Sequence, residues 1–317
     1  MATTAAPTAA AAVTTAIGKR GGKPGGLVAA SEARAGLLFV LPYLVFFVFL
    51  QLGALGFAFW VSLHHYDLLA LDNPFVGLNN YLKLPGNHDF LIALRNTTEY
   101  AVVVVVIQTI AALFFAILLD AKIKGRNFFR SAWYTPSIAS SAVISMIFLW
   151  VYHPTGLLNG ALGLIGIHTN EAWLHDTRFA LPALMGLNIW TTAPTFMLMF
   201  LAGLQDIPKE VYEAAQVDGA GFFKTIFQIT LPLLRPVIFL VVALGIIGAF
   251  QVFDQVYIMT EGGPLKSTLS VAYLIYQDLF KDTGTVGIAC AMAVVLGIVI
   301  FALTLLSRRI IDTKIEY

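Results

Sequence analysis

Six long apolar segments without Asp, Glu, Lys or Arg constrain the fold of this 317-residue chain more than any other feature. A helix needs about 20 apolar residues to cross a hydrocarbon core of about 30 Å. Helices satisfy their own backbone groups in lipid, and the segments lack the strict alternation of barrel strands. The sequence therefore predicts an all-α membrane protein with six transmembrane helices, at Gly36–Leu63, Tyr100–Leu119, Ser131–Tyr152, Phe179–Leu204, Pro236–Phe253 and Gly284–Ser307.

Composition supports this class and excludes others. The chain is 58% hydrophobic and 12% charged, whereas soluble domains carry about 25% charged residues. A net charge of +1 argues against a nucleic-acid-binding surface. The one cysteine, Cys290, excludes an intrachain disulfide and a thiolate metal cluster.

The distribution of basic residues predicts the orientation. In a six-span topology the two termini and the loops after the second and fourth spans lie on one side of the membrane and hold 14 Lys and Arg residues. The loops on the other side hold 5. The positive-inside rule places the richer side, with both termini and the loop 205–235, in the cytoplasm. Residues 1–34 are rich in Ala, Thr and Gly and are expected to form a disordered cytoplasmic tail, or in part an interfacial helix. Residues 35–317 are expected to form the six-span domain.

The loop 205–235 is polar but has the pattern of two short helices. Asp206-Ile207-Pro208 is typical of a helix start, with the carboxylate as the cap. We expect a helix from Lys209 to Val217, a reversal at Gly219 with positive φ, and a second helix from about Ala220 to Thr230. Glu213, with the small residues Ala214 and Ala215 beside it, is expected to enter a groove on another protein, although packing on the chain's own bundle is the alternative.

The spacing within this loop resembles a known motif. Glu213-Ala214-Ala215, three residues, Gly219, nine residues and Ile229-Thr230-Leu231-Pro232 match the EAA loop of permease subunits of binding-protein-dependent ABC importers. Ala202–Pro208 and Thr260-Glu261-Gly262-Gly263-Pro264 extend the likeness, which covers roughly residues 36–317. It is specific to the carbohydrate-uptake group that includes the maltose-type permeases.

The resemblance implies a multi-pass permease in the cytoplasmic (inner) membrane of a bacterium or archaeon. Its partners would be a second homologous permease, two ATPase subunits, an extracytoplasmic sugar-binding protein and membrane lipid. The chain has no G-x-x-x-x-G-K-[ST] sequence, so ATP and Mg would be bound by the ATPase, and this subunit would bind no cofactor and catalyse no reaction. By the resemblance, the loop forms the coupling helix, with its ATPase-coupling residues at Glu213, Ala214, Ala215, Asp218, Gly219, Ala220 and Pro232.

Uncharged polar and aromatic residues within the spans are candidates for the substrate path, because transporter sites lie near the bilayer midplane. The amides of Asn188 and Gln251 cannot be satisfied by their own helices alone, whereas Ser and Thr often bond to the preceding turn. Four serines of the third span (Ser137, Ser140, Ser141 and Ser145) are weaker candidates. The maltose-type resemblance points to the fourth and fifth spans, which gives Asn188, Trp190, Thr191, Thr192, Thr195, Gly248, Phe250, Gln251, Val252 and Asp254.

The predicted function is translocation of a carbohydrate delivered by a binding protein. Because the spans hold no cation to pair with a phosphate, a neutral di- or oligosaccharide is favoured over glycerol-3-phosphate, and a polyol is a further alternative within the family. An ion-coupled secondary carrier would need ionisable residues within the spans. A membrane scaffold or enzyme is the third alternative, but the six histidines are scattered over the exterior segments and form no catalytic constellation.

Overall fold

The computed structural model describes residues 26–67, 72–121, 125–281 and 283–311. The chain divides into two units, residues 1–57 and 58–317. The first unit contains α2 (Gly26–Phe46), a π-helix (Phe47–Leu52) and the start of α3 (Gly53–Ser62). Helix α2 begins ten residues before the expected span, so part of the segment expected to be disordered is helical. The good helix formers Ala29, Ala30, Glu32 and Ala33 explain this extension; the expectation for residues 1–25 lies outside the described residues.

In the described part of the second unit the regular elements are helices joined by loops, apart from one isolated bridge between His64 and Phe75. Its α-helices are α4 (Asn79–Lys83), α5 (His88–Asp120), α6 (Arg126–Tyr134), α7 (Ser141–Val151), α8 (Leu157–Leu164), α9 (Ala180–Asp206), α10 (Lys209–Val217), α11 (Phe222–Thr225), α12 (Leu231–Leu233), α13 (Arg235–Phe250), α14 (Asp254–Met259), α15 (Val271–Phe280) and α16 (Val286–Ile311).

Small residues let the long helices of this unit approach one another. Helix α5 packs along α9 and α13, and α13 also packs against α16. A Cβ on Gly245 of α13 would lie 2.6 Å from the Gln108 Nε2 of α5, and one on Gly203 of α9 would lie 2.7 Å from Val237 Cγ2. In lipid, helices associate through such close packing and through polar contacts rather than through burial from water.

Among the described residues, five helical segments are long and apolar enough to cross a membrane, and a sixth span results if one bent pair counts as a single crossing. The pair consists of residues Arg126–Ile138 and Ser141–Val151, and its two halves meet at 98°. The prediction of one continuous helix over Ser131–Tyr152 is therefore wrong. Pro136 cannot donate a backbone hydrogen bond, and the Ser140 hydroxyl accepts from Val143 N at 3.4 Å and starts a new helix.

The other spans are longer than expected. Helix α5 starts at His88 instead of Tyr100, because the Asn87 side chain caps it by accepting from two backbone N–H groups. The fifth crossing runs from Arg235 to Met259 with an interruption after Phe250.

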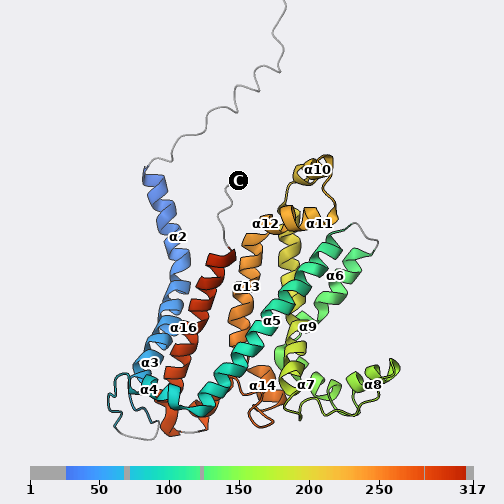
Figure 1. Cartoon of the computed structure of the whole chain (residues 1–317). Helices are drawn as coiled ribbons and strands as arrows, with labels where there is room; N and C mark the ends of the chain where they lie inside the picture. The colour runs from blue at the N-terminus through green and yellow to red at the C-terminus, as the bar shows by residue number, and fades with distance from the viewer. Residues whose placement is uncertain (1–25, 68–71, 122–124, 282, 312–317) are drawn as a thin grey trace, which may run out of the picture. The chain divides into compact units, whose positions relative to one another are not determined.

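The ends of these helices sort into two groups within the second unit. Figure 1 shows the ends of α9 and α16 and the start of α13 on the same side as α10, whereas α14 and α8 lie at the opposite end. Basic residues mark the first side at Lys209, Arg235, Arg308 and Arg309. This grouping agrees with the basic loops that the sequence assigned to one side of the membrane.

Candidate substrate pocket and coupling loop

Helix α10 occupies Lys209–Val217, the bounds expected from the sequence. Its start differs from the prediction, because Asp206 is the last residue of α9 and makes no cap to α10. The residue before α10 is Pro208, which is extended at ψ 138° and offers no capping side chain. A two-residue connection between α9 and α10 thus replaces the predicted carboxylate cap.

The reversal after α10 is a Schellman motif centred on Gly219. Gly219 has a φ of +72°, as the sequence predicted. Its N–H donates to Gln216 O at 3.1 Å, and the Ala220 N–H donates to Ala215 O at 2.9 Å. These two bonds define the motif and satisfy the last carbonyls of the helix.

The second helix of the loop runs further than expected. Helix α11 continues as a π-helix over Ile226–Thr230 and then as α12, so the predicted stop before Leu231 is wrong. Pro232 lies in the first turn of α12, where its missing N–H is tolerated.

The loop presents an apolar surface that the described part of the chain leaves uncovered. Val217 is 88% exposed and Phe223 is 73% exposed, and Phe222 and Phe227 are also exposed. Glu213 and Ala214 are exposed as well, whereas Ala215 is buried. Tyr212 turns inward, and its hydroxyl lies 3.4 Å from Thr230 Oγ1. A rigid turn that carries exposed aromatic residues is typical of a docking surface.

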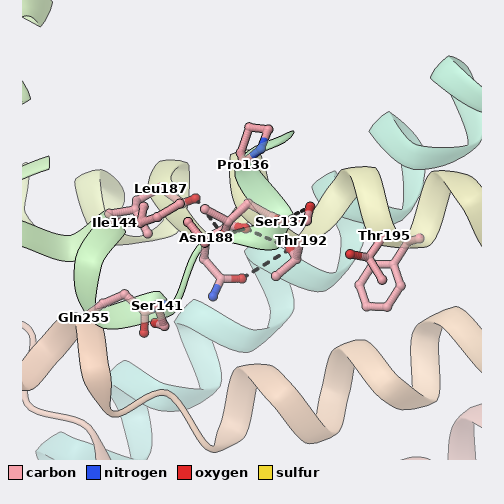
Figure 2. A pocket seen from close by; sticks show the side chains of 12 residues that line it. Pro136, Ser137, Ser141, Ile144, Leu187, Asn188, Thr192, Thr195 and Gln255 are labelled. Carbon is pink, nitrogen blue, oxygen red and sulfur yellow. Dashed lines mark hydrogen bonds between the residues drawn. The ribbon is translucent and has the colours of Figure 1, made fainter. Parts of the chain in front are cut away.

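Several of the predicted path residues meet in one cavity of about 300 Å³, shown in Figure 2. Helix α9 contributes Asn188 and three threonines, Thr191, Thr192 and Thr195. The bent segment contributes Ser137 and Ser141, and α14 contributes the amide of Gln255. The lining is Pro136, Ser137, Ala139, Ser141, Ile144, Leu187, Asn188, Thr191, Thr192, Thr195, Phe196 and Gln255.

The bend of the third span and a proline of the fourth combine to shape this cavity. Pro194 lies inside α9, where a proline removes a backbone donor from the helix. The Ser137 hydroxyl donates to Thr191 O at 2.6 Å, one turn before that proline. Ser137 therefore joins the bent segment to α9 at the cavity wall.

A buried amide that the sequence analysis did not single out supports the α9 wall from behind. Gln108 of α5 is 2% exposed, and its Oε1 accepts from Thr192 Oγ1 at 2.6 Å. The same hydroxyl lies 2.8 Å from Asn188 O. The sequence did contain a signal for Gln108, because it is a lone amide within the otherwise apolar second span. Gln255 was also missed, because the break after Phe250 places it beyond the predicted end of the fifth span.

The remaining predicted path residues lie outside the cavity lining. Trp190 is 40% exposed and its ring lies 5.4 Å from that of Phe148. Phe250 and Val252 are buried in the core of the unit. Gly248, Gln251 and Asp254 are exposed and are absent from the lining. The structure thus brings together the set from the fourth span, except Trp190, but not the set from the fifth.

The family described as the inner membrane component of binding-protein-dependent transport systems matches residues 108–312, which include both the cavity and the loop. The chain belongs to this family. It is 35% identical over 284 residues to the trehalose/maltose transport system permease protein MalF of Thermococcus litoralis, with 88% of this chain and 94% of that protein covered. It is 31% identical over 282 residues to the sn-glycerol-3-phosphate transport system permease protein UgpA of Salmonella typhimurium, covering 88% and 95% respectively.

A solved structure shares the fold of this permease. A bacterial ABC transporter involved in the import of the acidic polysaccharide alginate superposes with a TM-score of 0.75 at 21% identity, covering 89% of this chain and 97% of that one. The family match and the likeness to MalF, rather than this shared fold, identify the chain as a permease of the sugar ABC importer family.

The cavity of the permease carries no formal charge. Its lining contains hydroxyls from Ser and Thr, the two amides of Asn188 and Gln255, and apolar groups. None of the twelve lining residues is Asp, Glu, Lys, Arg or His. The arrangement can exchange hydrogen bonds with a neutral polar molecule but offers no counter-ion to a charged one.

Proposed function

We propose that this permease carries a neutral di- or oligosaccharide through the cavity beside Asn188. The observation that carries the proposal is the convergence of one amide and three threonines from α9 with serines of the bent segment on one uncharged cavity. Sugar hydroxyls both donate and accept hydrogen bonds, and the amides and hydroxyls of the lining can do the same.

The same lining disfavours a phosphorylated cargo. A phosphate ester carries up to two negative charges, and burying an unpaired charge costs far more than burying a hydroxyl. The permease UgpA, named for glycerol-3-phosphate, is comparably similar to this chain, so the choice depends on the cavity and not on overall likeness.

We further propose that α10 is the coupling helix and that its exposed face docks on a partner ATPase. Glu213 and Ala214 are exposed on α10, and the Schellman turn at Gly219 fixes where Val217 and the aromatic residues of α11 project. Glu213, Ala214, Ala215, Asp218, Gly219, Ala220 and Pro232 remain the proposed coupling residues. ATP and Mg would be bound by the ATPase, and both termini of the permease would be cytoplasmic.

The complete transporter would contain a second homologous permease, two ATPases and an extracytoplasmic sugar-binding protein. One solved relative in fold is a bacterial alginate ABC transporter in complex with an alginate-pentasaccharide-bound periplasmic protein. It matches with a TM-score of 0.73 at 22% identity.

Uptake by the assembled transporter tests the cargo and the cavity together. Asn188→Leu removes the amide from the cavity and should weaken sugar uptake about three- to tenfold, the value of one or two neutral hydrogen bonds. Gln251→Leu is the matched control, because Gln251 is exposed outside the lining and should tolerate the change.

Competition with unlabelled compounds completes the test. Neutral di- and oligosaccharides should inhibit uptake, whereas glycerol-3-phosphate should not. The proposal fails if glycerol-3-phosphate is the saturable cargo, or if the Gln251 variant loses uptake and the Asn188 variant keeps it.

A further inference from the structure

An apolar cleft of about 220 Å³ lies between α5 and α6, away from the substrate cavity. Its lining consists of Phe115, Leu118, Leu119, Phe129 and Trp133. The rings of Phe115 and Trp133 pack at 4.1 Å and form one wall. The outer rim is open, because Leu118 is 48% exposed and Phe129 is 54% exposed.

Two buried N–H donors at this cleft have no acceptor among the described residues. They are the indole Nε1 of Trp133 and the guanidinium Nε of Arg130. Another nitrogen of the same guanidinium donates to Leu119 O at 2.9 Å, which places Arg130 beside the lining. Both unpaired nitrogens are fully covered by the chain's own atoms, so neither is offered to a ligand in the cleft.

The surrounding sequence is basic. Lys122, Lys124, Arg126 and Arg130 follow the end of α5, and Asp120 is the one acidic residue from there to the end of α6. Clusters of Lys and Arg at the end of a membrane helix attract anionic lipid head groups, each contributing about 1 kcal/mol near the surface.

We propose that this cleft binds an anionic glycerophospholipid. One acyl chain occupies the apolar cleft, and the head-group charge lies near the exposed Arg126 and the partly exposed Arg130. The lining suits an acyl chain better than a peptide, because a peptide backbone would leave its own polar groups unpaired in such a cleft. The charge bias places this lipid in the cytoplasmic leaflet.

Quenching of Trp133 by brominated lipids tests the proposal on the full chain in nanodiscs. Subtracting the signal of Trp133→Phe isolates this residue from the other four tryptophans. Brominated phosphatidylglycerol should half-saturate the Trp133 signal at a lower mole fraction than brominated phosphatidylcholine, by about fivefold for each basic side chain engaged.

Paired variants separate the charge from the cleft. Arg130→Gln should reduce the preference for phosphatidylglycerol about fivefold, whereas Arg130→Lys should keep most of it and exclude misfolding as the cause. Arg309→Gln, at an exposed arginine in the last turn of α16, should change nothing. Leu118→Phe should shield Trp133 from both lipids, and Leu305→Phe, at a comparably exposed leucine, should not.

Three results would overturn the proposal. The first is equal half-saturation by the two lipids in the unaltered chain, and the second is an unchanged preference in Arg130→Gln. The third is loss of Trp133 quenching when the chain is purified with its partner subunits, because a protein surface would then cover the cleft.

Discussion

Replacement of Gly219 by Ala tests whether the geometry of the turn after α10 controls docking of the partner ATPase. At a φ of +72° an L-residue pays about 1–2 kcal/mol that glycine does not. A Cβ at this position would meet no atom within 4 Å, so backbone strain is the only cost. If the free loop of the variant relaxes that strain by leaving the Schellman geometry, docking on the ATPase must restore this geometry at the same cost. The expected loss of ATPase affinity is therefore about 5- to 30-fold.

The chain offers close controls for this experiment. Gly221 lies two residues away at a φ of −72°, and a Cβ there also meets nothing within 4 Å. Gly221→Ala should bind the ATPase like the unaltered chain, and Gly219→Asn should recover part of the loss because Asn tolerates positive φ.

The measurements are the affinity of the purified ATPase for the reconstituted permease and hydrogen exchange at residues 218–221. Faster exchange in Gly219→Ala alone would locate the effect in the turn. Equal affinities of Gly219→Ala and Gly221→Ala would refute the reasoning, as would an Asn variant as weak as the Ala variant.

Three further predictions follow from contacts within the second unit. Gly245→Ala should destabilise the permease in detergent by about 1–3 kcal/mol through overpacking against Gln108, while Gly248→Ala, with open space around it, should leave the unfolding temperature unchanged. A double-mutant cycle of Gln108→Leu and Thr192→Val, measured by unfolding in bilayers or detergent, should show a coupling of about 0.6 kcal/mol, and a value near zero would contradict the 2.6 Å bond. Hydrogen bonds from Arg178 lower the pKa of Asp176 from 3.8 to about 2, so this pair stabilises the fold above about pH 4 and its effect is lost as the pH falls through about 2. Arg178→Gln should therefore lower the unfolding temperature slightly near neutral pH and leave it unchanged near pH 2, and a larger loss in acid than at neutral pH would argue against this assignment.

Features that depend on the length of an apolar segment or on the local preference of a Gly or Pro could be predicted from the sequence. The bounds of α10 follow from Pro208 before it and Gly219 after it, and the positive φ at Gly219 follows from the absence of a side chain. The membrane spans follow from the cost of burying charge in lipid. Their middles were placed well, but several ends were not, because polar caps such as Asn87 extend a helix beyond its apolar run.

Features that depend on breaks in a helix were not predicted. The bend of 98° between Ile138 and Ser141 lies inside an uncharged segment that averaged hydropathy treats as one span, and Pro136 and Ser140 were the local signals of it. Likewise, each residue along a helix turns the side chain by about 100°, and the interruption after Phe250 resets that direction. Gln255 of α14 consequently lines the cavity, whereas Gln251 lies at the break and is exposed.

Helix α9 runs from the cavity to the coupling loop, and its packing indicates how a movement at one would reach the other. Thr195 lines the cavity, and α10 begins three residues after α9 ends at Asp206, so about 17 Å of helix separates the two regions. Gly203 lets Val237 of α13 approach so closely that the end of α9 and the start of α13 have no room to slide independently. The loop-side ends of α9 and α13 should therefore move together. Each helix should bend on the cavity side of this contact, α9 at Pro194 and α13 at the break after Phe250. Spin labels on the loop-side ends of α9 and α13 should keep a constant separation through the transport cycle while their distances to α7 change, and independent motion of the two ends would contradict this mechanism.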